Sequence, residues 1–267
     1  MTSSSKLLGS RKSELTQEQV ATYHRDGVLL VREAFDAYEV QELGDEADRI
    51  LESHAHLLNE NNLRTRYTPH HESGLPVFEK FDPFVDLSSV ARMMVQDERI
   101  RKPLSAIYGE PACLFKDKLI YKPPGATGAT LHQDWISWPG FPESFITVLV
   151  AIDPFTATSG ATVFYLGEHK RGYLSPRDTQ QHHILEASQF EVRPTPLEME
   201  PGDMAMFSCF VPHRSAPNLS CRHRRGYFIS YNALSDGGDQ YQSHYAEFHQ
   251  WIRARYPDPR RSEFYFA

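Results

Sequence analysis

Apolar residues recur at helical spacing in the first part of the chain. Thr16 is a good helix N-cap and Gly27 a good helix end, with Val20 and Tyr23 on one face between them. From Asp36 onward, apolar residues three and four apart continue to about residue 58 and predict an amphipathic helix that packs on a sheet. We also expect a strand at 28–31 and two short helices at 88–95 and 98–108.

After residue 110 the pattern changes to short apolar runs separated by turn sequences such as Pro123-Pro124-Gly125. These runs predict strands at 113–121, 146–152, 161–166, 190–193, 204–210 and 226–232. A last helix is expected at 241–256, with four apolar residues inward, Tyr245, Phe248, Trp251 and Ile252. This order predicts a mainly β protein with flanking helices around a double-stranded β-helix (jelly-roll, cupin-like) core.

The pattern is expected to form one domain over residues 15–267. Its parts are a helical region at 15–109, the jelly-roll core at 110–235 and a C-terminal helix at 240–256. Residues 1–14 are polar and Ser-rich without an apolar stretch, which predicts a disordered leader rather than a secretion signal. Residues 59–84 have weak periodicity and many polar residues, and we expect a long loop that acts as a lid over a site.

Composition narrows the classes of function. A net charge of −7 disfavours nucleic acid as a partner, and no window reaches the roughly 18 apolar residues of a membrane span. The three cysteines lack CxxC spacing, so we expect reduced thiols, most simply buried, rather than a disulfide framework or a thiolate zinc site. We expect a cytoplasmic protein, monomeric or homodimeric, whose partner is a small-molecule substrate.

The tripeptide His132-Gln133-Asp134, together with the much later His213, is the strongest chemical signal. Residues 132 and 134 project from the same side of an extended segment. Two imidazoles and one carboxylate bind one face of Fe(II) and leave three coordination positions open. The pattern therefore predicts a catalytic metal site made of His132, Asp134 and His213 in an oxygenase.

The chain resembles the phytanoyl-CoA hydroxylase (PhyH)-like family of Fe(II)- and 2-oxoglutarate-dependent dioxygenases over residues 23–232. The resemblance rests on the order and spacing of short motifs, namely residues 23–28, 121–123, 132–134, 159–162 and 166–170 with His213 and Arg224. The stretch 116–123 most resembles enzymes that hydroxylate aminoalkylphosphonates, and the family also contains ectoine hydroxylase. The resemblance implies a jelly-roll fold and a need for Fe(II), 2-oxoglutarate and O2, with ascorbate as a support in vitro.

The resemblance also implies residues that bind the cosubstrate. Arg224, eleven residues after His213, matches the arginine whose planar fork takes the distal carboxylate of 2-oxoglutarate, and Ser215 matches the hydroxyl that assists it. Trp138 matches an aromatic residue near the cosubstrate, although it could merely fill the barrel mouth. Lys116 lies on a strand that similar enzymes use to reach cosubstrate or substrate.

Alternatives remain at two of these positions. Arg222 and Arg225 compete with Arg224, and the basic run 222–225 could also be a solvated strand entry. His169 and His223 compete with His213 for the third metal position. His223 directly precedes Arg224 and therefore projects from the opposite side of an extended chain, so we favour His213.

The residues that would contact substrate are less sharply defined. Lys118 shares one face of the expected strand 113–121 with Lys116 and Ile120. If it points inward, it predicts an anionic group on the substrate, such as phosphonate, phosphate or carboxylate; if outward, it is a solvated strand residue. Ile120 departs from the polar residue of ectoine hydroxylase, which puts ectoine in doubt. The remaining candidates are Trp135, which could instead back the core, and Arg64, Tyr67 and His70 of the expected lid.

The predicted reaction is hydroxylation of an aliphatic C–H of a small polar metabolite or natural product, with release of succinate and CO2. The carboxylate of Asp134 argues against the related halogenases, in which a small residue takes its place. Desaturation, oxidative cyclisation and epimerisation stay open. Two other classes have the same ligand set, a zinc hydrolase or isomerase and a non-catalytic metal-binding jelly roll, and neither needs the carboxylate clamp of Arg224 and Ser215.

Overall fold

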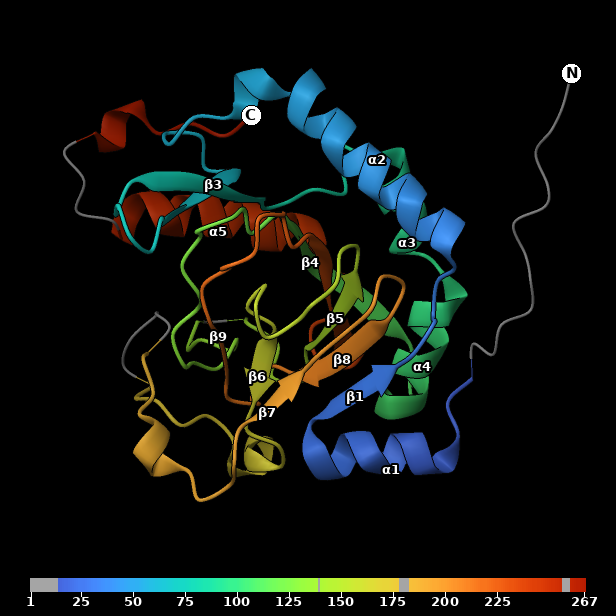
Figure 1. Cartoon of the computed structure of the whole chain (residues 1–267). Coiled ribbons are helices and arrows are strands. Elements are labelled where there is room, and N and C mark those ends of the chain that lie inside the picture. The colour runs from blue at the N-terminus through green and yellow to red at the C-terminus, as the bar shows by residue number, and fades with distance from the viewer. Residues whose placement is uncertain (1–13, 139, 178–182, 256–259) are drawn as a thin grey trace, which may run out of the picture.

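The structure is a computed structural model that describes residues 14–138, 140–177, 183–255 and 260–267 (Figure 1). The helices within these residues are α1 (Gln17–Asp26), α2 (Ala37–Ser53), α3 (Ser89–Met94), α4 (Glu98–Tyr108) and α5 (Tyr241–Arg255), with short 3-10 helices at Ala55–Leu57, Glu168–Arg171, Ala187–Gln189 and Arg261–Glu263. The strands are β1 (Val28–Val31), β2 (Thr65–Pro69), β3 (Pro76–Phe81), β4 (Ala112–Ile120), β5 (Ile146–Ala151), β6 (Thr162–Phe164), β7 (Thr195–Leu197), β8 (Met204–Ser208), β9 (His213–Ser215) and β10 (Gly226–Ala233).

Two antiparallel sheets form the centre of the molecule. The larger has the strand order β1-β8-β5-β10-β4-β3-β2, and the smaller the order β7-β6-β9 (Figure 1). Leu149, Phe164 and Phe207 belong to an apolar cluster to which both sheets contribute, and a larger cluster joins the other face of the large sheet to the helices. Strands β5 and β10 are buried along their whole length because both of their faces are covered. This architecture confirms the predicted mainly β, jelly-roll fold with flanking helices.

Helix α2 contributes to the larger apolar cluster, which lies between the large sheet and the helices, through the apolar stripe that its sequence predicts. Asp36 caps its first turn, and Leu43, Ala47 and Ile50 are fully buried. Burying a leucine or isoleucine side chain contributes about 1.5–3 kcal/mol. The Tyr121 hydroxyl donates to the carbonyl of Ala47 at 2.7 Å, so the helix also anchors the chain just beyond β4. The helix ends at Ser53 and is followed by a 3-10 turn, a few residues before the predicted end.

The prediction of a long loop at 59–84 is wrong. The segment contains the hairpin β2–β3, which extends the large sheet beyond β4. Arg66 of β2 pairs with Lys80 of β3, and Lys80 pairs with Ile120 of β4. The usual alternation of apolar and polar residues is hidden here, because the face turned toward the interior carries charged side chains.

The small sheet also differs from the prediction. Residues 190–193, expected to form a strand, follow a 3-10 helix, and the strand lies at Thr195–Leu197 instead. Strand β9, at His213–Ser215, was not predicted at all. Both strands have three residues, which is too short for a periodic pattern to be recognised.

The three cysteines are free, and only Cys209 is buried, so the expectation of buried thiols fails for the exposed Cys221 and the half-buried Cys113. The final helix agrees with the prediction, with Tyr245 and Ile252 buried and Phe248 and Trp251 half-buried. No helix in the described ranges has the length and apolarity to cross a membrane.

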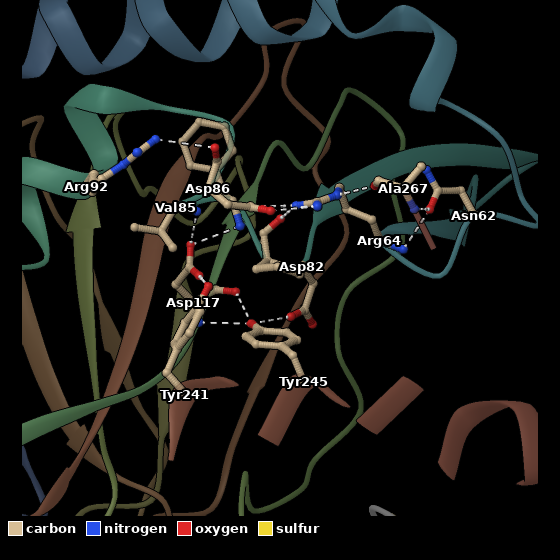
Figure 2. A network of polar contacts seen from close by, with 12 residues as sticks. Asn62, Arg64, Asp82, Val85, Asp86, Arg92, Asp117, Tyr241, Tyr245 and Ala267 are labelled. Atoms are coloured by element: carbon tan, nitrogen blue, oxygen red, sulfur yellow. Dashed lines mark hydrogen bonds and ion pairs between the residues drawn. The ribbon is translucent and has the colours of Figure 1, made fainter. Parts of the chain in front are cut away.

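The outer face of β4 carries a buried polar network centred on Asp117 (Figure 2). The carboxylate accepts four hydrogen bonds, from the backbone N–H groups of Phe84 (3.0 Å) and Val85 (2.9 Å) and from the hydroxyls of Tyr227 (3.0 Å) and Tyr241 (2.7 Å). The Tyr245 hydroxyl of α5 contacts the carbonyl of Asp117 at 2.8 Å. The network ties α5 and the chain after β3 to β4, and thereby fixes the strand that carries Lys116 and Lys118.

Candidate metal and cosubstrate site

His132 and His213 meet across a backbone bridge. The N–H of His132 donates to the carbonyl of His213 at 3.0 Å, and the N–H of His213 donates to the carbonyl of His132 at 2.9 Å. Directly opposed residues in an antiparallel pair point to the same side, and the two ring centroids are 4.4 Å apart. Asp134, two residues along the chain, lies on that side as well. One ligand atom from each of the three residues lies within 4.8 Å of the others.

The two imidazoles are held in the state that ligates a metal. Nδ1 of His132 contacts the carbonyl of Thr130 at 2.6 Å, and Nδ1 of His213 contacts that of Val211 at 3.0 Å. A carbonyl only accepts, so Nδ1 carries a proton in both rings and Nε2 is the nitrogen that would ligate a metal. Burial, helped by the neighbouring His132 ring, lowers the pKa of His213 to about 4, and the ring is neutral at neutral pH.

Asp134 provides the negative charge of the group. Its Oδ1 lies 3.7 Å from Nε2 of His132 and 3.9 Å from Nε2 of His213. Burial opposes its ionisation, but the His132 ring, Lys118 and His213 hold the pKa of the Asp134 carboxyl well below its usual range. Oδ2 accepts a hydrogen bond from the Thr147 hydroxyl at 3.3 Å, a contact that the sequence did not suggest. Two imidazoles and one carboxylate are a donor set that fits Fe(II).

Neither rival histidine approaches this group. In the described ranges the residues that could jointly hold a metal are His132, Asp134 and His213. His169 packs at the end of α1, where a Cβ added to Gly27 would lie 2.4 Å from its Nδ1. The His223 ring lies edge-on to Tyr121. The structure thus brings His213, rather than His169 or His223, to the His-x-Asp pair.

Arg224 is buried without a carboxylate partner in the described part of the chain. Its side chain is 4% exposed, and its guanidinium lies 4.2 Å from the centre of the Phe155 ring. Nη1 donates to the carbonyl of Gly160 at 3.0 Å, whereas Nε has no hydrogen-bond partner among the described residues. Arg225 instead pairs with two aspartates, and Arg222 is exposed. A buried cation with an unused donor fits an anionic ligand, so Arg224 suits the predicted carboxylate clamp best.

Ser215 belongs to the same cluster as Arg224 through Lys122. Its Oγ accepts from the backbone N–H of Ala129 at 3.0 Å and from Nζ of Lys122 at 3.1 Å. Nζ of Lys122 also donates to the carbonyl of Gly160, at 3.1 Å, the same oxygen that Arg224 contacts. Lys122 was not among the predicted site residues. The available signal was a lysine at the point where β4 runs into the Pro-Pro-Gly turn.

Lys116 and Lys118 project from the face of β4 on which the triad lies. Lys116 pairs with Ser230, and Ser230 pairs with Thr147, whose hydroxyl contacts Asp134. Paired residues share a face of the sheet, and Lys118 shares that face with Lys116. Burial lowers the pKa of Lys118 to about 8, although the attraction of Asp134 works in the other direction. The inward orientation is therefore the one that the structure adopts.

Two further cations on this face were missed, Arg66 of β2 and Lys80 of β3. Arg66 pairs with Lys80, Lys80 pairs with Ile120, and Ile120 lies two residues from Lys118. Nη2 of Arg66 is buried and has no hydrogen-bond partner among the described residues. Both were overlooked because they lie in the segment that was expected to be a loop.

The two predicted tryptophans pack against aromatic neighbours. Trp135 is buried in a small core cluster, with its ring centre 4.6 Å from that of Tyr173, so it backs the core. Trp138 stacks on Trp251 of α5, with ring centres 5.1 Å apart. The structure brings Trp138 to α5, and none of its described ring contacts is to Arg224 or the triad.

Arg64 is a correction to the predicted substrate site. Its guanidinium makes two hydrogen bonds to Asp86, at 2.6 and 2.7 Å, and one to the carbonyl of Ala267 at 2.5 Å (Figure 2). It also donates to the carbonyl of Pro83 at 3.1 Å. With its donors used in this way, Arg64 holds the hairpin to neighbouring segments instead of presenting a charge to a substrate.

Tyr67 and His70 are also engaged elsewhere. Tyr67 pairs with Phe78, which packs on the apolar cluster of the outer face, so its ring points away from the triad. His70 packs on the turn at Gly125, where an added Cβ would lie 1.9 Å from its Nε2. The structure thus does not bring Tyr67 and His70 to the triad, because the hairpin turns these side chains outward or into a turn.

Comparisons with known proteins agree with this site. Residues 23–226 match the family model described as phytanoyl-CoA dioxygenase (PhyH). A methylphosphonate hydroxylase of Gimesia maris is 34% identical over 158 residues, which are 58% of this chain and 58% of that protein. A 2-aminoethylphosphonate dioxygenase of the uncultured bacterium HF130_AEPn_1 is 33% identical over 169 residues, 62% of this chain and 63% of that protein. The chain thus covers less than two thirds of the length of either relative.

The fold has relatives among solved structures. The epimerase SnoN, crystallised with Fe3+, alpha-ketoglutarate and nogalamycin RO, superposes with a TM-score of 0.69 at 20% identity, covering 82% of this chain and 83% of that one. This likeness supports the jelly-roll architecture. The family match spans most of the chain and includes all three residues of the triad. The chain therefore belongs to the phytanoyl-CoA dioxygenase (PhyH) family.

Proposed function

We propose that this protein is a non-haem Fe(II)- and 2-oxoglutarate-dependent dioxygenase that hydroxylates an aliphatic C–H of a small metabolite with an anionic group, releasing succinate and CO2. The observation that carries the proposal is the combination of a facial donor set with a buried arginine that has no carboxylate partner in the described residues. A zinc hydrolase or a structural metal site has no use for the second element.

The roles follow from the donor atoms. His132, Asp134 and His213 would hold Fe(II), and Arg224 and Ser215 would bind the distal carboxylate of 2-oxoglutarate. When bound, iron with 2-oxoglutarate and O2 supplies an oxidant that can break an unactivated C–H bond. The chain's own contribution is to fix Nδ1 of both imidazoles on backbone carbonyls, which leaves Nε2 as the ligating nitrogen, and to hold the cosubstrate in one orientation.

The substrate class is suggested by charge. Lys118, with Lys116 and Arg66 on the same face, favours an anionic substrate group near Asp134, whereas Lys80 is already paired with Glu79. Two relatives are named for phosphonates, so phosphonates and aminoalkylphosphonates come first within this class. Ile120 in place of a polar residue keeps ectoine a poor candidate.

Domain organisation, oligomeric state, partner and cellular compartment can also be inferred. We infer one catalytic domain over residues 15–267 that acts on a small molecule, as a monomer or homodimer. The net charge of −7 disfavours nucleic acid. The three free thiols are consistent with a reducing compartment, which favours the cytoplasm.

The first test measures binding of Fe(II) and 2-oxoglutarate and requires no turnover. Purified protein with Fe(II) and 2-oxoglutarate under anaerobic conditions should develop a visible metal-to-ligand charge-transfer band, whereas Fe(II) or 2-oxoglutarate alone should not. With O2 and ascorbate, a screen of phosphonates, phosphates and carboxylates should then identify substrates by succinate release. A protein that binds Fe(II) but never forms the band would overturn the proposal.

Product mass separates hydroxylation from its alternatives. Hydroxylation adds one oxygen atom to the substrate, whereas desaturation and oxidative cyclisation remove two hydrogens and epimerisation leaves the mass unchanged. The solved epimerase with this fold makes the last outcome worth measuring, by chiral separation of the recovered substrate.

A further inference from the structure

Lys122 adopts an unusual conformation for a lysine. Its φ angle is +36°, in the left-handed region that residues other than glycine rarely occupy. The backbone is held there by Asn218, whose amide donates to the carbonyl of Lys122 at 2.8 Å, and by the N–H of Arg224 at 3.2 Å from the same carbonyl. Such a conformation persists only where the surroundings impose it, so the position of this side chain is strongly determined.

The Lys122 ammonium has three acceptors around it. Nζ lies 3.1 Å from the carbonyl of Gly160, 3.1 Å from Oγ of Ser215 and 2.5 Å from the carbonyl of Ala216. An ammonium has three N–H donors, so all three are used within the protein. The space for Nζ depends on Gly160, because a Cβ at that position would lie 2.6 Å from it.

These contacts determine what the Ser215 hydroxyl can do. Its oxygen has two lone pairs, and both face donors, the N–H of Ala129 and Nζ of Lys122. The hydroxyl proton is therefore left to be donated to a further acceptor. Without Lys122, one lone pair would be free and the hydroxyl could also turn to accept.

The cluster carries more positive than negative charge. Lys122 is 2% exposed and Arg224 4%, and they share one acceptor, the carbonyl of Gly160. Burial, followed by the repulsion of Arg224, lowers the pKa of Lys122 to about 7, and Glu79 is the acidic residue that acts against this shift. Burying two cations this close together is costly unless an anion joins them.

We propose that Lys122 is a positioning residue of the cosubstrate subsite, which fixes the Ser215 hydroxyl as a donor and adds a second positive charge beside Arg224 for the distal carboxylate of 2-oxoglutarate. The inference rests on the proposed function. It predicts that Lys122 governs the choice between a 2-oxo dicarboxylate and a 2-oxo monocarboxylate, and that binding the dicarboxylate draws a proton onto the lysine.

The experiment compares dissociation constants of the anaerobic Fe(II) protein for 2-oxoglutarate and for 2-oxopentanoate, which has a methyl group in place of the distal carboxylate. Both chelate iron through the same atoms, so the charge-transfer band reports both without turnover. Lys122→Met should reduce the preference for 2-oxoglutarate about tenfold while leaving 2-oxopentanoate binding nearly unchanged. Lys102→Met, the same replacement at a half-exposed position of α4, is the matched control and should keep the wild-type ratio.

A double substitution tests the route through the hydroxyl. If Lys122 acts partly by orienting Ser215, the effects of Lys122→Met and Ser215→Ala on the ratio should be less than additive. An unchanged ratio in folded Lys122→Met overturns the inference, as does an equal loss of affinity for both 2-oxo acids. Absence of the band in wild-type protein would instead refute the proposed function.

Calorimetry of the wild-type protein decides the matter if Lys122→Met does not fold. Binding of 2-oxoglutarate in buffers of different ionisation enthalpy should take up most of one proton at pH 8 and about a tenth of one at pH 6. The charged groups facing Lys122 are Arg224, whose pKa is about 10, and Glu79, whose pKa is lowered, and neither titrates between these values. No uptake at pH 8 overturns the inference.

Discussion

Two neighbouring residues of β4, the buried Asp117 and the half-buried Lys118, place ionisable groups on opposite faces of the sheet, and their surroundings differ. Asp117, on the outer face, accepts four hydrogen bonds from the protein, and burial nevertheless raises its pKa to about 7. Lys118, on the inner face, makes no hydrogen bond within the described ranges, and its Nζ lies 5.6 Å from the centre of the Phe228 ring. The first group is satisfied by the fold itself, while the second is left for a ligand.

This difference indicates that the outer face of β4 contributes to stability and the inner face to function. A buried group with all its partners supplied holds elements together, and losing it should cost stability. A half-buried cation without a hydrogen-bonding partner contributes little to the stability of the empty protein and is available to an anion. Three substitutions and one pH dependence can test whether one face of β4 serves stability and the other ligand binding.

The largest effect is expected at Asp134, the carboxylate that faces Lys118. Asp134→Ala removes the anionic metal ligand and should lower turnover by more than about 100-fold, since altering even an outer partner of a ligand costs about 10- to 100-fold. Steady-state succinate release measures the loss, and a thermal melt checks the fold. Turnover near the wild-type level would show that the triad is not the reaction centre.

Lys118→Met should raise the KM for an anionic substrate about 10- to 100-fold, because a hydrogen bond to a charged group is lost. The melting temperature should stay the same or rise, since a half-buried cation has been replaced by an apolar chain of similar length. Binding of 2-oxoglutarate, followed by the charge-transfer band, is the internal control. A fall in stability with no change in KM would assign Lys118 to the fold.

Asp117→Asn tests the outer face. The NH2 group of the asparagine amide would face the N–H and O–H groups that donate to the Asp117 carboxylate. We therefore expect a loss of about 1–2 kcal/mol in the free energy of unfolding. In a chain of this size that lowers the melting temperature by about 2–8 °C. The kcat/KM of the folded enzyme should remain within about threefold of wild type. If activity fell as far as in Lys118→Met while stability was unchanged, the two faces would not be separate.

The smallest effect is a pH dependence. The pKa of Lys118 is lowered to about 8, so its positive charge is present at pH 7 and is lost as the pH rises. Affinity for a substrate whose own charge is constant should fall about fourfold between pH 7 and pH 8.5. A divalent metal at Asp134 lowers this pKa further and shifts the fall to lower pH. Lys118→Arg keeps its charge and should abolish the dependence.

Features encoded over a few residues were predictable from the sequence. The helices, the long strands and the pair His132 and Asp134 follow from periodicity and spacing, and Arg224 from resemblance. The cation at Lys118 was identified, but its direction depended on the register of β4 with β10, which no local pattern reveals.

Features that depend on distant contacts were missed. The hairpin β2–β3 was not predicted because Arg66 and Lys80 place charge on an interior face, which breaks the usual alternation of apolar and polar residues along a strand. Arg64, from the same hairpin, was assigned to the substrate, but its partners lie in other segments of the chain. The role of Lys122 was not predicted because it depends on contacts with Gly160, Ser215 and Ala216, which lie far from Lys122 in the sequence.

The backbone bridge between His132 and His213 has a consequence for biosynthesis. A nascent chain that has emerged only as far as Asp134 holds two of the three ligands and cannot close the metal face, because a preformed site rarely exists before folding. The third ligand arrives with the backbone pairing of residues 132 and 213, so the complete donor set forms only once these two distant segments have folded together.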